Sequence, residues 1–104
     1  DSAAARVDAE GYAALAPLVE AAVVLAEALA ASDTPQVTTS AHDVLAAVER
    51  ARIDDGAWDS LARELRTRAE EVARAGELSS AREAFEPLSR AIERVLARYG
   101  NPTD

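Results

Sequence analysis

Few side chains in this sequence could carry chemistry. His42 is the only histidine, and one imidazole holds a metal ion only when carboxylates supply the other ligands. Two pairs among the 19 acidic residues are adjacent in sequence, Asp54 with Asp55 and Glu70 with Glu71. Residues next to each other in sequence point to different faces of a helix, so neither pair predicts a metal centre or a catalytic site. We therefore assign no catalytic, cofactor-binding or metal-binding residue.

The aromatic residues and the absence of sulfur also argue against an active site. Trp58 and Tyr12 could line a small-molecule pocket, but both fall at the spacing of core positions. The chain has no cysteine and no methionine, which excludes disulfides, thiolate chemistry and sulfur ligands for copper. All basic residues are arginines, and they are scattered rather than clustered. These features indicate a protein that is not an enzyme and needs no cofactor.

Length and charge limit the classes of partner. With 104 residues the chain is expected to form a single domain, 1–104. It carries 19 acidic and 11 basic residues, a net charge of −8, and an acidic surface repels phosphate backbones. No stretch approaches the roughly 18 continuous apolar residues of a membrane span. We expect a protein partner, no nucleic acid and no membrane insertion.

Apolar residues recur every three or four positions in four segments, which predicts helices at about 7–31, 35–52, 56–75 and 80–99. Abundant alanine and sparse glycine favour helix as well. The predicted buried stripes are Tyr12, Leu15, Leu18, Val19, Ala22, Leu25, Ala26, Leu29; Val37, Ala41, Val44, Val48, Ala51; Trp58, Leu61, Leu65, Ala69, Val72; and Ala81, Phe85, Leu88, Ile92, Val95, Tyr99.

Capping signals set the expected helix ends. Thr34, followed by proline, is the expected N-cap of the second helix, and Ser40 offers a later alternative. Asp54 and Asp55 are the expected caps of the third helix, which should end at Gly76, and Ser80 with Glu83 forms a capping box for the fourth, which should end at Gly100.

Short connections between amphipathic helices predict an all-α fold, an antiparallel up-down-up-down four-helix bundle. Pro17 and Pro87 lie inside the first and fourth predicted helices, each between two apolar residues of the stripe. Both helices are therefore expected to bend at proline rather than stop. Phe85, the only phenylalanine, is expected to be buried beside Pro87.

Trp58, the run REAFEPLSRAI at 82–92 and the closing Tyr99–Gly100 resemble the helical domain of unknown function that accompanies periplasmic heavy-metal efflux adaptors, the membrane-fusion components of copper and silver pumps. The similarity extends through YAALAPLVEAAVVLAEALAASD at 12–33. That family usually continues with a Cys-Pro-Met segment that resembles a soft-metal ligand set, whereas this chain ends GNPTD. Gly56 and Asp59 also stand where the family often has histidine or methionine, so the resemblance implies no metal ligand here.

The resemblance implies a non-enzymatic, periplasmic or otherwise extracytoplasmic accessory or interaction module, linked to a metal-efflux or envelope system. The alternative is a histidine phosphotransfer domain that uses His42 on the second helix of the bundle. Such domains have lysine and glycine three and four residues after the histidine, where this chain has Leu45 and Ala46. The alternative stays open at this point.

Overall fold

The computed structural model describes residues 13–101, which contain four helices and no strand. The helices are α2 (Leu15–Ala30), α3 (Thr34–Arg50), α4 (Trp58–Arg74) and α5 (Leu78–Tyr99). Each helix packs against the next along the chain, and α5 also contacts α2. The predicted all-α class is confirmed.

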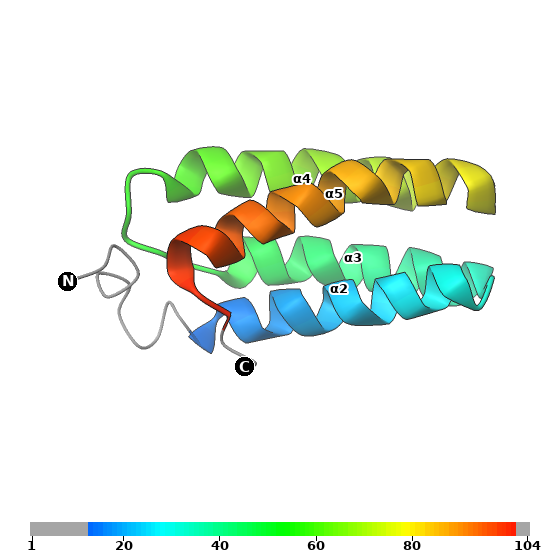
Figure 1. Cartoon of the computed structure of the whole chain (residues 1–104), viewed down its shortest axis with the longest axis horizontal. Helices are drawn as coiled ribbons and strands as arrows, with labels where there is room; N and C mark the ends of the chain where they lie inside the picture. The colour runs from blue at the N-terminus through cyan, green and yellow to red at the C-terminus, as the bar shows by residue number, and fades with distance from the viewer. Residues whose placement is uncertain (1–12, 102–104) are drawn as a thin grey trace.

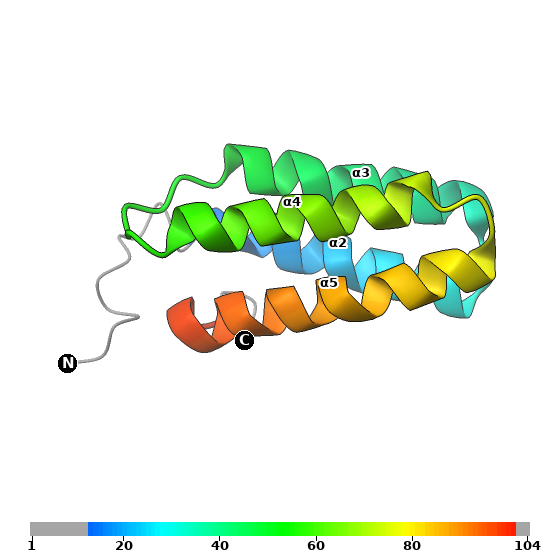
Figure 2. The same ribbon diagram turned by 90° about the horizontal axis from the view of Figure 1, so that it is seen from above.

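The helices lie side by side with their axes roughly aligned, and both Figure 1 and Figure 2 show this arrangement. The colours of Figure 1 show that each helix runs in the opposite direction to the one before it. The start of α2, the α3–α4 loop and the end of α5 therefore lie at one end of the bundle.

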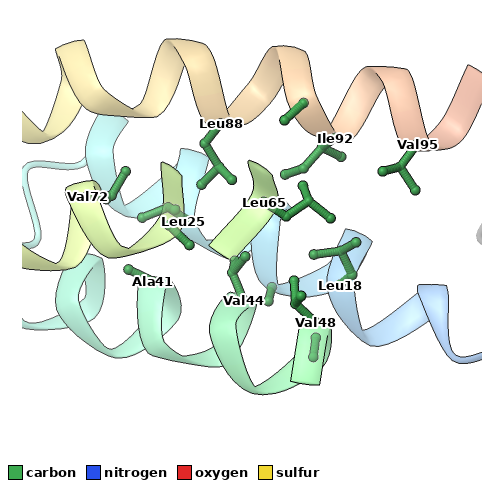
Figure 3. Close-up of a cluster of buried hydrophobic side chains, with 14 of the residues drawn as sticks. Leu18, Leu25, Ala41, Val44, Val48, Leu65, Val72, Leu88, Ile92 and Val95 are labelled. Carbon is green, nitrogen blue, oxygen red and sulfur yellow. The ribbon is translucent and has the colours of Figure 1, made fainter. Parts of the chain in front are cut away.

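Leucine, valine and alanine side chains from all four helices fill the space between them, and Figure 3 shows this core. Leu18, Leu25, Val44, Leu65 and Leu88 are almost fully buried. Full burial of one such side chain contributes about 1.5–3 kcal/mol, so this core is the main source of the fold's stability. The predicted stripe of the second helix, Val37 to Ala51, is buried at every position.

Four residues of the predicted stripes are more exposed than expected, since three are only partly buried and one is exposed: Ala22, Leu61, Phe85 and Ala26. Phe85 packs against the edge of the core but is only partly buried, so the prediction that it is buried is wrong. Ala26 is exposed, while Ala21 and Ala28 of the same helix are buried. On α2 and α5 small residues share the buried face with leucine, because close helix packing leaves room for little else.

Several helix starts differ from the predicted ones. Asp33, not Thr34, caps α3, and its carboxylate accepts a hydrogen bond from the Gln36 amide at 3.2 Å. Ser40 is no cap, because it is buried inside α3 and donates to the Gln36 carbonyl at 2.6 Å. Helix α5 begins at Leu78, so Ser80 lies within its first turn and makes no capping box.

The two prolines occupy different positions in their helices. Pro87 lies inside α5, which continues through it to Tyr99 as predicted. Pro17 lies in the first turn of α2, where amide groups have no partner within the helix. In a continuous helix its ring would clash with the Ala13 carbonyl, which explains why α2 starts at Leu15. The predicted start near residue 7, like the prediction for Tyr12, lies outside the described residues.

The α2–α3 link is a tight turn that α5 stabilises. The amides of Ser32 and Asp33 donate to the carbonyls of Leu29 (3.3 Å) and Ala28 (2.9 Å), the pattern of a Schellman motif. Ser32 has φ 58°, the left-handed conformation that glycine usually supplies. Arg82 of α5 donates to the Leu29 carbonyl at 2.7 Å and to the Ser32 hydroxyl at 3.0 Å. This arginine therefore fastens the start of α5 to the end of α2.

Candidate functional site

The most connected polar group among the described residues is the Asp55 carboxylate, in the loop between α3 and α4. One of its oxygens, Oδ2, accepts hydrogen bonds from the Tyr99 hydroxyl and from Arg98 Nε, both at 2.7 Å. Oδ1 accepts from a terminal guanidinium nitrogen of Arg98 at 3.2 Å and from the Ala57 amide at 3.4 Å. We call Asp55, Arg98 and Tyr99 the end clamp, because they join this loop to the last turn of α5.

The electrostatics of the end clamp favour the ionised form of the Asp55 carboxyl. The hydrogen bonds from Arg98 and then from Tyr99 hold the pKa of the Asp55 carboxyl well below its usual value. Burial, and then the hydrogen bond to the carboxylate, raise the pKa of the Tyr99 phenol. A carboxylate that accepts four hydrogen bonds is a poor base, so the end clamp is a structural element rather than a catalytic group.

Aromatic packing completes this end of the bundle. Trp58, the first residue of α4, is buried as predicted, and its ring meets the Tyr99 ring edge to face with centroids 6.1 Å apart. The Arg98 guanidinium lies 5.7 Å from the centre of the Tyr99 ring. Trp58 is thus a core residue here, and it also lines a neighbouring hollow.

That hollow, of about 380 Å³, lies between the end of α3, the following loop and the start of α4. Charged side chains of both signs line it, including Arg52, Asp54 and Asp59, with Trp58 as its largest apolar wall. Arg66, also in the lining, pairs with Glu49 at 2.9 Å. The mixture of charges favours no ligand of one sign.

The other groups considered in the sequence, His42 and the Glu70–Glu71 pair, do not form a shared site. His42 is exposed on α3, and its ring forms no hydrogen bond or ion pair within residues 13–101. Glu70 pairs with Arg74 at 3.9 Å and Glu71 with Arg68 at 3.1 Å, so the two carboxylates serve different neighbours. Within the described part of the chain, no three histidine or carboxylate side chains gather closely enough to hold a metal ion.

The outer surface of α2 is the feature that sequence reasoning missed. Among the described residues, the exposed large hydrophobic side chains are Val23 (51% exposed) and Val24 (36%), which are both on this helix. Alanines at 26 and 30 are exposed beside them, and the charged residues of α2 are only Glu20 and Glu27. Two adjacent valines cannot both face the core of one helix, so the pair Val23–Val24 was the signal in the sequence for an exposed apolar side chain.

Beside this surface a groove runs between α2 and α3, with a volume of about 310 Å³. Pro17, Ala21 and Val24 line it from α2, and Ala46 and Ala47 from α3. Its polar side chains are Glu20, Asp43 and Arg50. The α2 face and this groove together form the candidate interaction surface of the described bundle.

Residues 19–104, most of the chain and all of α3, α4 and α5, match the profile of a family described as Protein of unknown function (DUF3347). The chain belongs to this family. The DUF3347 match confirms the predicted helical domain of unknown function and leaves its link to copper and silver efflux adaptors a prediction.

No curated protein and no solved structure matches the chain. No helix within residues 13–101 of this DUF3347 domain is long and apolar enough to cross a membrane.

Proposed function

We propose that this DUF3347 domain is a non-enzymatic interaction module of an extracytoplasmic protein linked to a metal-efflux or envelope system. Its partner is a protein, which it contacts through the exposed face of α2. The observation that carries the proposal is the exposure of Val23 and Val24 on an otherwise charge-poor helix surface. Adjacent exposed apolar side chains favour contact with another protein.

Comparison with α4 makes the α2 face stand out. The solvent side of α4 carries charged residues throughout, among them Arg63, Arg66 and Glu71, and several are tied in ion pairs. A charged face of this kind is well solvated, so covering it with a partner would contribute little free energy to binding. Covering the α2 face would remove valine and alanine surface from water and desolvate only two carboxylates.

The extracytoplasmic setting and the efflux link rest on the resemblance carried by Trp58, residues 82–92 and Tyr99–Gly100. The structure gives two of these residues a physical role, since Trp58 and Tyr99 pack together at one end of the bundle. The pattern that marks the resemblance is thus partly a packing pattern. It supports a shared domain and carries no metal ligand with it.

Site-specific photo-crosslinking in cells that make the full-length protein tests the proposal. We expect a photoreactive amino acid at Val23 to capture a discrete protein, while the same amino acid at Thr67, exposed on α4, captures none. Absence of a crosslink at Val23, or equal crosslinks from both positions, would contradict the proposal.

A phosphotransfer domain is the second candidate, because the His42 ring is exposed on a bundle helix, as that reaction requires. The residues after it, Leu45 and Ala46, do not fit that family's pattern, which places this candidate second. Incubation with a phosphorylated receiver domain decides between the two. Acid-labile phosphate that disappears in a His42→Ala variant would establish phosphotransfer, and its absence would remove it.

A further inference from the structure

The groove between α2 and α3 has the form of a helix-binding site. Ala21 and Ala47 are 9% and 3% exposed and lie at its base, so the backbones of both helices are close to whatever occupies it. Pro17 and Val24 provide apolar walls. Small residues at the base and larger apolar residues at the sides suit a ridge of side chains from a third helix.

Charges on and beside the groove are mainly negative. Glu20 and Asp43 line it on opposite helices, with Arg50 as the single cation of the lining. Glu27 follows Glu20 by seven residues on the exposed side of α2, two helical turns or about 10 Å further along. In the described residues none of these three carboxylates forms an ion pair, in contrast to Glu49, Glu64 and Glu71.

We propose that this groove receives one α-helix of a partner protein, with a stripe of small and aliphatic residues flanked by arginine or lysine seven residues apart. The inference rests on the proposed interaction function and names the chemistry of its partner. The apolar stripe contacts Pro17, Ala21 and Val24. The two cations pair with Glu20 and Glu27, which lie at the matching spacing.

Charge argues against a second copy of this chain as the occupant. Each copy carries a net charge of −8, and two α2 faces brought together would place Glu20 and Glu27 of one copy near those of the other. Like charges across an interface oppose association, whereas a basic helix removes that cost. The complementary partner is therefore basic.

The test uses the full chain and a hydrocarbon-stapled peptide of about 18 residues, long enough for five turns. The peptide has an alanine and leucine stripe flanked by two arginines at seven-residue spacing, and its control has glutamates in place of the arginines. We expect the basic peptide to bind, with amide shifts concentrated at Val24, Asp43 and their neighbours. We expect the acidic peptide not to bind.

Matched variants locate the contact. Val24→Glu, inside the groove, should weaken binding by at least about tenfold, whereas Thr67→Glu, exposed on α4 away from the groove, should weaken it less than about threefold. Glu20→Gln should weaken binding at low salt and lose this effect at high salt, while Glu93→Gln on α5 should change nothing. Circular dichroism of each variant checks that the bundle is folded.

Four results would overturn the inference. Two concern the peptides, namely no binding of the basic peptide or equal binding of the acidic one. The other two reveal a different occupant of the groove. They are a dimer in sedimentation that Val24→Glu dissociates, and nuclear Overhauser contacts between the groove and the chain's own first twelve residues. If the peptide fails while Val23 still crosslinks a protein in cells, the partner chemistry is wrong and the interaction function stands. If the basic peptide does not bind and Val23 crosslinks no protein, the partner chemistry and the interaction function are both wrong.

Discussion

Tyr99 donates its hydroxyl hydrogen to the Asp55 carboxylate across 2.7 Å, although 44 residues separate the two in sequence. Asp55 belongs to the α3–α4 loop and Tyr99 is the last residue of α5. Because successive helices alternate in direction, both residues lie at the same end of the bundle (Figure 1). The contact therefore joins the end of α5 to the loop between α3 and α4.

The end clamp predicts a loss of stability in acid. The pKa of Asp55 is lower in the folded chain than in the unfolded chain, where it is about 3.9. Its contribution is thus fully present above that unfolded value and is lost as pH falls toward the folded value. Urea unfolding at pH 7, 4 and 3 should show Asp55→Asn less stable than the natural chain at pH 7 and a shrinking difference at lower pH.

Glu93→Gln is the control for this measurement, because Glu93 is an exposed carboxylate that forms no ion pair within residues 13–101. It should change stability little at any of the three values of pH. An Asp55→Asn variant whose deficit stayed constant from pH 7 to pH 3 would show that ionisation of Asp55 does not stabilise the fold.

Sequence reasoning predicted the helices well because core spacing is a strong and local signal. The four segments and the burial of Trp58 and Tyr99 followed from apolar residues at steps of three and four. It misread Asp55 as a helix cap, because its main partners, Arg98 and Tyr99, come from another helix. The alternating direction of the predicted helices places Asp55 and Tyr99 at the same end of the bundle, but it does not predict the hydrogen bond between them.

The candidate surface was harder to predict, since the exposed α2 face is made of residues that also suit a core. Val23 and Ala26 differ from Leu25 in position around the helix, not in chemistry. Ala26 was expected to be buried for that reason. Which arc of an apolar helix faces solvent depends on how the other helices pack against it, and a single sequence does not give that packing.

Ser32→Gly should stabilise the chain by about 0.5–1 kcal/mol. Ser32 is held in the left-handed region at φ 58°, which costs a residue with a side chain roughly 1–2 kcal/mol and glycine almost nothing. Part of that gain is offset by the lost hydrogen bond from Arg82 and by the greater freedom of glycine in the unfolded chain. Thermal and urea unfolding measure the difference.

Ser32→Ala separates the two effects, because it keeps the left-handed strain and loses the hydroxyl. We expect it to be slightly less stable than the natural chain. A stabilised alanine variant and a destabilised glycine variant would show that backbone strain at Ser32 does not limit stability.

Leu88→Ala should cost more than Phe85→Ala, even though phenylalanine is the larger side chain. Leu88 is fully buried among residues of the other helices (Figure 3), and such truncations cost about 2–5 kcal/mol. Phe85 lies at the edge of the core and is only partly buried, so its truncation should cost about 1–3 kcal/mol. Urea unfolding of both variants gives the order, and the reverse order would show that Phe85 is a central core residue.

Pro87→Ala should raise stability by about 1–2 kcal/mol. Alanine at this position supplies an amide that can donate to the Glu83 carbonyl one turn earlier, and it removes the ring from the interior of α5. The full helix-interior penalty of proline, about 3 kcal/mol, is reduced because proline also restricts the unfolded chain. Thermal unfolding should therefore move to higher temperature without a change in helix content.

Pro17→Ala is the matched control, since both prolines precede a buried leucine but only Pro87 has a full turn of the same helix before it. In the first turn of α2 the missing amide has no partner to lose, so Pro17→Ala should change stability by less than about 0.5 kcal/mol. If both variants gained stability equally, position within the helix would not explain the tolerance of proline. If Pro87→Ala unfolded the chain, the proline itself would be required to hold α5 against the core.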